Sequence, residues 1–164
     1  MNFSREARHL LSSPWLARRA FPRSTLLAIE RAIEESERSH GAQVRFAVEG
    51  SLHGKRLLHG QSARDRGLEL FSILRMWDTE HRNGVLIYVL LADHAVEIIA
   101  DRGAHAKIGD SPWQEVCREM QTAFSRGEYK KGAVEGIRAI SQHLGRHFPV
   151  LKRDNELPDR PIVL

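Results

Sequence analysis

Cysteine, long apolar runs and a strong excess of one charge are the features that this sequence lacks or has little of. The single cysteine of the 164 residues, Cys117, permits no disulfide within the chain, so we expect a cytoplasmic protein. The sequence contains no run of about 18 apolar residues, the length that would be needed to span a bilayer, and the N-terminus lacks the apolar core of a secretory signal. With 25 Lys and Arg against 21 Asp and Glu, the net charge of +4 is a mild excess.

The short motifs of the common enzyme classes are also missing. The sequence contains no GxxxxGK[ST], GxGxxG, HExxH, paired CxxC or GxSxG, which excludes the usual phosphate, dinucleotide, zinc and nucleophile-elbow signatures. Cys117 lies on an apolar helical stripe beside Val116 and Met120, which indicates a core residue rather than a nucleophile. Motifs therefore leave open whether the chain is an enzyme.

A pair of strands over residues 83–103 is the most distinct feature that the sequence contains. Seven consecutive apolar residues, Val85 to Leu91, predict a strand that is buried on both faces. Residues 92–95 form a short turn and residues 96–100 a returning strand, so a β-hairpin is predicted. With the turn centred on Asp93 and His94, the numbers of paired residues sum to 187, which places Asn83 near residue 104.

Helical and strand periodicity predict the remaining elements. Ser24 is the expected N-cap of a helix that ends near residue 41, residues 43–49 alternate as in a half-buried strand, and residues 61–77 form a second helix. This strand-helix-strand unit predicts two parallel strands. Ser111 opens a third helix with a capping pattern, and residues 133–144 carry a fourth. The predicted fold class is α/β, a three-layer α/β/α sandwich with a mixed sheet and a central β-hairpin.

The two ends of the chain differ in composition from this α/β domain. We expect a basic N-terminal segment over residues 1–23, the domain over residues 24–148 and an extended C-terminal tail over residues 149–164. The N-terminal segment could contact an anionic surface, but a short helix that caps the core is the preferred interpretation. The final residues 162–164 are expected to tuck back onto the body of the protein.

Polar residues gather where the predicted topology brings the strand ends together. The starts of both parallel strands and the end of the third strand share one edge, so loop residues there can converge. The residues at this edge are His40, Gln43, Asp78, Glu80, His81, Arg82, Asn83, Asp101, Arg102, His105 and Asp110. Carboxylates, an Asn side chain and loop carbonyls are the ligands that calcium and magnesium prefer.

A metal or phosphate site at this edge has an alternative of equal weight, a ring of capping and turn residues that the strand ends require. The candidate ligand residues are Asp78, Arg82, Asn83, Asp101, Arg102 and Asp110, with Gly84 and Gly103 as structural glycines that allow tight loops. From the hairpin register we expect Asn83, Asp101 and Asp110 in one loop cluster, at the sheet end opposite the turn.

At these residues the chain resembles a known family, the TPM domain, which occurs in a plant thylakoid-lumen protein and in many bacterial proteins. The resemblance covers about residues 25–147 and depends on the order of elements and on four stretches. These are Gly41-Ala42-Gln43-Val44, Asn83-Gly84-Val85-Leu86, Val96 to Gly103, and Phe124 with Gly127, Tyr129 and Gly132. It implies an α/β/α sandwich, calcium binding in loops at the sheet end of some members, and weak acid phosphatase activity in the plant member.

Two stretches depart from the family pattern. Phe21-Pro22-Arg23-Ser24 stands where many members have a stretch with Asp, and Asp101-Arg102-Gly103 stands where many have G-x-G, so an acidic ligand would be missing. The ending Asn155 to Pro161 looks like that of a soluble bacterial subgroup. Its members resemble partners of membrane-associated LemA-type proteins and of exported TPM proteins, which implies an accessory role near the membrane.

Three functions follow from these observations. The preferred one is a TPM-type accessory or protein-interaction domain, with a divalent metal as an added ligand at the sheet end and a LemA-type or another TPM protein as partner. The alternative is a weak metal-dependent phosphatase that uses the same edge residues. Nucleic-acid binding through the Arg-rich N-terminus comes last, because no strand carries interleaved basic and aromatic residues, and no nucleic-acid partner is expected.

Overall fold

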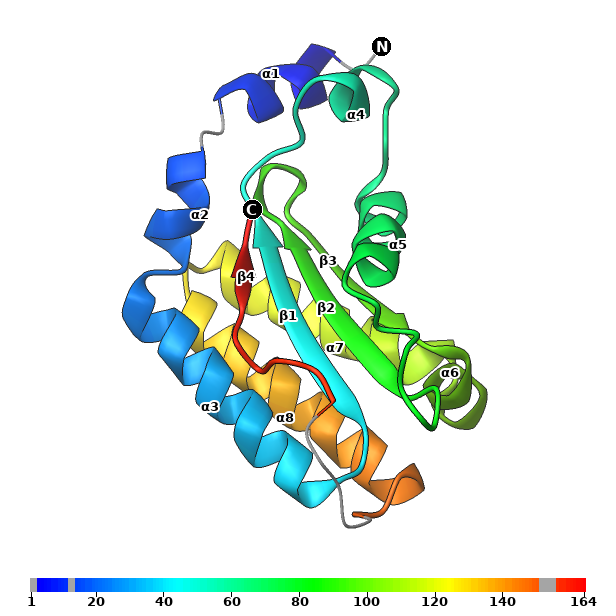
Figure 1. Cartoon of the computed structure of the whole chain (residues 1–164). Helices are drawn as coiled ribbons and strands as arrows, with labels where there is room; N and C mark the ends of the chain where they lie inside the picture. The colour runs from blue at the N-terminus through cyan, green and yellow to red at the C-terminus, as the bar shows by residue number, and fades with distance from the viewer. Residues whose placement is uncertain (1–2, 12–13, 151–155) are drawn as a thin grey trace.

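The computed structural model describes residues 3–11, 14–150 and 156–164, and its centre is one mixed sheet (Figure 1). The strands β1 (Gln43–Glu49), β2 (Gly84–Leu90), β3 (Ala95–Ala100) and β4 (Ile162–Val163) lie in the order β3-β2-β1-β4. β1 is parallel to β2 and to β4, whereas β3 is antiparallel to β2. The predicted hairpin is therefore confirmed, and β4 is the tail folded back onto β1.

Helices cover both faces of this sheet, which confirms the predicted α/β sandwich (Figure 1). The helices α3 (Arg23–Ser39), α7 (Asp110–Ser125) and α8 (Tyr129–His147) enclose the larger core, and α5 (Ala63–Ile73) covers the other face. The smaller helices are α1 (Phe3–Leu11), α2 (Pro14–Ala20), α4 (Lys55–Leu58), the 3₁₀ turn η1 (Leu91–Asp93) and α6 (Arg102–Ile108). Strand residues alternate between the two cores, as the pleat requires.

The hairpin register differs from the predicted one by two in the sum of paired residue numbers. Val85 pairs with Ala100 and Leu90 with Ala95, so paired numbers sum to 185 rather than 187. The physical reason is the turn, because η1 takes up residues 91–93 and His94 adopts a left-handed conformation with φ 52°. The expected neighbour of Asn83 was therefore wrong.

Two predicted helix starts and one burial pattern were also wrong. α3 begins at Arg23 with Pro22 as its N-cap, so Ser24 lies inside the helix. α7 begins at Asp110 after Gly109, whose φ of 80° sets the bend, and Ser111 is already helical. β1 is buried along nearly its whole length rather than on one face, because cores lie on both sides of it. α4, α6 and strand β4 were not predicted as elements.

The N-terminal helices pack against the hairpin turn and the core. The Asp93 carboxylate accepts hydrogen bonds from Arg5 Nη2 at 2.7 Å and from His9 Nε2 at 2.9 Å, and His9 Nδ1 accepts the Leu52 N–H at 2.9 Å. Burial raises the pKa of the Asp93 carboxyl, but the hydrogen bonds from Arg5 and His9 together lower it by more. The pKa of Asp93 is therefore below its usual value. Phe21, at the end of this segment, is buried in the larger core.

None of the helices in the described ranges is long and apolar enough to cross a membrane.

Candidate functional site

Two buried polar side chains stand out at the sheet end where β1 and β2 begin. Asn83 is fully buried, donates from Nδ2 to the Gly41 carbonyl at 2.9 Å and lines a cavity of about 300 Å³. Asp101 is the N-cap of α6, and its Oδ1 accepts the Arg102 N–H at 2.7 Å. Within the described part of the chain, Asn83 Oδ1 and Asp101 Oδ2 accept no hydrogen bond. Two buried oxygens are thus left for a ligand.

Two glycines at this sheet end allow the loops to approach closely. A Cβ atom on Gly84 would overlap the Met76 carbonyl oxygen. A Cβ atom on Gly103 would lie 2.6 Å from the carbonyl oxygen of Arg82 and 2.7 Å from that of His81. The Gly103 N–H donates to this same Arg82 carbonyl at 2.9 Å, so the loop before β2 and the start of α6 are joined.

The other predicted edge residues occupy different surroundings. Asp78, Arg82 and Arg102 are exposed, and Arg82 has a left-handed backbone with φ 50°. Asp110 faces His105 at 3.6 Å, and both line a groove beside β3 rather than the cavity of Asn83. The structure therefore places Asn83 just before β2 and Asp101 just after β3, and the Asp101 N–H donates to the Gly84 carbonyl. Of the three residues, Asn83 lines the cavity, whereas Asp101 and Asp110 do not.

The donor set at this sheet end fits a hard cation only in part. In the portion of the chain that is described, no three His, Cys, Asp or Glu residues gather in a metal-holding arrangement. Calcium takes six to eight oxygen ligands, and the side chains here supply Asn83 Oδ1 and Asp101 Oδ2. Loop carbonyls and water would have to complete the shell.

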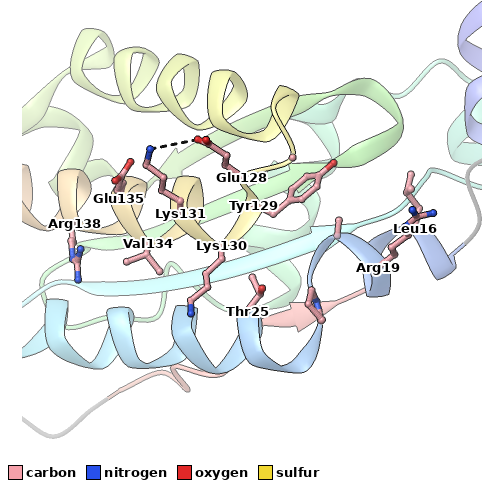
Figure 2. Close-up of a pocket in the computed structure, with 13 residues that line it drawn as sticks. Leu16, Arg19, Thr25, Glu128, Tyr129, Lys130, Lys131, Val134, Glu135 and Arg138 are labelled. Atoms are coloured by element: carbon pink, nitrogen blue, oxygen red, sulfur yellow. Dashed lines mark ion pairs between the residues drawn. The ribbon is translucent and has the colours of Figure 1, made fainter.

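A larger groove, which sequence reasoning missed, lies between the start of α8 and the α2–α3 corner (Figure 2). Its volume is about 790 Å³, and apolar side chains such as Leu16, Val134 and Tyr129 line it. The charged residues of the groove are Arg19, Lys130, Lys131, Arg138, Glu128 and Glu135. Cations therefore outnumber carboxylates, and Lys131 faces Glu128 at 3.6 Å (Figure 2). The adjacent Lys130 and Lys131 were the sequence signal that could have indicated it.

A buried charge network on the other face of the sheet was also missed. Arg66 donates from Nε to Glu49 Oε2 at 2.9 Å, and the Tyr88 hydroxyl donates to the same oxygen at 2.8 Å. Burial raises the pKa of Tyr88, and Glu49 raises it further, so the phenol stays protonated. Arg56 and Gln61 hold the pKa of Glu69, at the exposed end of the network, at about 2. These groups link α5 to β1 and β2 and are structural.

Comparison with known proteins agrees with this architecture. The family profile described as the TPM domain matches residues 18–143. The solution structure of the BA42 protein from the psychrophilic bacterium Bizionia argentinensis is 29% identical, with a TM-score of 0.74, and the match covers 85% of this chain and 92% of that one.

A second solution structure, of the N-terminal domain of a P. gingivalis protein, has the same fold. It is 19% identical with a TM-score of 0.58, and the match covers 75% of this chain and 76% of that one. No curated protein matches this chain significantly.

Proposed function

Because this chain belongs to the TPM domain family, we propose that it is an accessory domain that binds a segment of a partner protein in the groove of Figure 2. The observation that carries this proposal is the combination of an apolar lining with an excess of cations over carboxylates around it. Amphipathic helices bind to grooves of this kind through one apolar face. The partner segment is therefore amphipathic and acidic.

The position of the charges supports an acidic partner. Lys130 and Arg138 lie on α8, and Arg19 lies on α2, so cations approach the groove from both sides (Figure 2). Lys130 and Arg138 are exposed, so their charge is available to a partner. Complementary charge steers association and selects between partners more than it adds affinity.

Calorimetric titration with the soluble part of a LemA-type protein tests the proposal, because the family resemblance makes such a protein the expected partner. The double variant Lys130→Glu, Arg138→Glu should weaken binding at least about tenfold and reduce its salt dependence. Arg126→Glu is the matched control, since Arg126 is exposed near the groove but does not line it, and should bind as the wild type does. Equal affinity for all three proteins would refute the groove as the binding site, and a second TPM protein serves as the alternative probe.

A second candidate function is a divalent metal site at the sheet end, and with it a weak metal-dependent phosphatase that uses Asp101 and Arg102. The unpartnered Asn83 Oδ1 and Asp101 Oδ2 support it. A cation bound there would supply charge to hold a phosphate group, and Asp101 and Asn83 would hold the cation.

Thermal unfolding with calcium or magnesium tests this candidate. The Asp101→Ser variant keeps an N-cap acceptor for α6 and removes the second carboxylate oxygen, so the metal-dependent rise in Tm should disappear. Asp110→Ala, which removes an exposed carboxylate that faces His105, should keep that rise. Hydrolysis of p-nitrophenyl phosphate that is lost with Asp101→Ser but kept with Asp110→Ala would identify a phosphatase. If the wild type shows neither a metal-dependent rise in Tm nor this hydrolysis, the site is refuted.

A further inference from the structure

The outer edge of β3 has hydrogen-bonding groups that no strand of the described chain pairs. β3 is the first strand in the order β3-β2-β1-β4, so only β2 lies next to it (Figure 1). Natural proteins protect such edges with proline, lysine or a bulge. β3 has the sequence AVEIIA and pairs with β2 in unbroken register, so it carries none of these protections.

The register shows which backbone groups face outward. The Asp101 N–H donates to the Gly84 carbonyl at 2.8 Å, which makes these two residues a hydrogen-bonded pair. Such pairs alternate along antiparallel strands, so Val96, Ile98 and Ala100 direct their N–H and C=O groups away from β2. The Ile98 amide lies beside the thiol of Cys117 on α7, and it opposes the burial that raises the pKa of Cys117 to about 11.

A groove of about 600 Å³ follows this edge. Residues 96–100 form its base, with Arg64 and Leu68 of α5 on one side and Trp113, Cys117 and Arg118 of α7 on the other. Trp113 is only 4% exposed, yet its Nε1 donor has no hydrogen-bond acceptor in the described residues. A buried donor without an acceptor carries an energetic cost that a ligand carbonyl would remove.

We propose that an extended segment of a partner protein adds to the sheet beside β3 and pairs with Val96, Ile98 and Ala100. Its main-chain hydrogen bonds supply affinity, and its alternate side chains enter the spaces along α5 and α7. Small apolar side chains fit beside Trp113 and Cys117. This surface and this mode of binding are distinct from those of the helix groove in Figure 2.

Two arginines, Arg64 and Arg118, and two carboxylates, Glu97 and Asp110, line this groove, so the charges favour a carboxylate of the segment only where it passes between the two arginines. Arg64 stands on the α5 side, where it meets Glu97 at 3.4 Å, and Arg118 is exposed on the α7 side. Arg64 is itself 57% exposed, so it can reorient toward an incoming carboxylate. The segment that fits is therefore extended, with small apolar side chains and a carboxylate that lies between Arg64 and Arg118.

Selection of random twelve-residue peptides displayed on phage, with the full chain immobilised, tests this proposal. Enriched peptides should be free of proline at alternate positions, and a synthetic copy should slow hydrogen exchange of the Val96, Ile98 and Ala100 amides. Ala100→Pro removes one outward N–H and should weaken peptide binding about tenfold while the far-UV circular dichroism stays native. If that variant does not fold, the exposed double variant Arg64→Glu, Arg118→Glu provides the same measurement.

Two controls separate this proposal from the groove of Figure 2 and from self-association. The variant Lys130→Glu, Arg138→Glu should bind the selected peptides normally, so the two proposals can fail independently. The proposal is overturned if no peptide is enriched, or if selected peptides bind folded Ala100→Pro and the double variant Arg64→Glu, Arg118→Glu as they bind the wild type. It is also overturned if sedimentation shows a dimer whose β3 amides are already protected from exchange. That last result would make a second copy of the chain the occupant.

Discussion

Replacing Gly84 with alanine perturbs the place where the central strand and the candidate metal site begin. An added Cβ atom would overlap the carbonyl oxygen of Met76, which belongs to the backbone and cannot swing away as a side-chain end could. Gly84 also accepts the Asp101 N–H through its own carbonyl, so a shift of this strand start would disturb both strands of the hairpin.

The expected cost follows from the nature of the obstacle. Overpacking a close-packed interior costs about 1 to 3 kcal/mol, and a backbone obstacle puts Gly84→Ala at the upper end, at about 3 kcal/mol. Gly84→Val should cost more, because two further methyl groups enter the same space. Asp110→Ala should cost about 1 kcal/mol or less, since Asp110 is 69% exposed and its contact with His105 is a long surface pair.

Urea and thermal unfolding, both followed by circular dichroism, measure these differences. For a chain of this size, 3 kcal/mol corresponds to a fall in Tm of about 6 to 12 °C, well above the effect expected for Asp110→Ala. If Gly84→Ala unfolds within about 0.5 kcal/mol of the wild type, or if Asp110→Ala is the more damaging change, the reasoning from close approach is wrong.

Three further predictions concern buried ionisable groups. Burial lowers the pKa of His40 to about 4, so the folded state favours the neutral imidazole. The free energy of unfolding should therefore fall by about 3 kcal/mol between pH 6.5 and pH 4. In urea titrations at a series of pH values, His40→Gln should flatten this dependence on pH. The pKa of Asp93 is also lowered in the folded state, so its contribution is present above about pH 4 and lost at lower pH, and Asp93→Asn should remove this acid-dependent part. Arg66→Met should lower the stability by about 3 to 5 kcal/mol, because Glu49 remains buried without its cation. Adding Glu49→Leu should recover part of that loss. If the losses of the two single variants simply add in the double variant, this reasoning is wrong.

The main elements of the fold were predictable because apolar patterns dominate them. The run from Val85 to Leu91 indicated a strand buried on both faces, and β2 has that burial throughout. The register was not predictable, because His94 takes a left-handed conformation and η1 adds a helical turn, which composition alone does not specify. α6 was not predicted because its few apolar residues show no clear helical period. β4 was not predicted as a strand because only two of its residues pair with β1.

The candidate site was less predictable than the fold. Asn83 and Asp101 were expected together on topological grounds, but their unpartnered oxygens become evident only once the hydrogen bonds of the neighbouring loops are known. The groove of Figure 2 joins α2 and α8, which are more than a hundred residues apart in sequence, so the adjacent Lys130 and Lys131 indicate one of its walls and no local pattern indicates the other. Arg66 and Glu49 were missed because single charges in a sequence are typical of solvent-exposed positions, and their burial depends on each other.

The two edges of the sheet, formed by β3 and β4, differ in a way that limits how the protein can assemble. β4 pairs with β1 through residues 47–48, the Leu164 N–H donates to the Val48 carbonyl at 2.9 Å, and Gln43 Oε1 accepts two further amides from the tail. A growing fibre of stacked sheets needs an open edge at each end of every subunit. β4 is the outer strand on that side, and because only Ile162 and Val163 lie in the sheet, it offers a much shorter edge than β3 does. A fibre that grew through the β3 edge would therefore find almost no strand on the opposite side from which to continue.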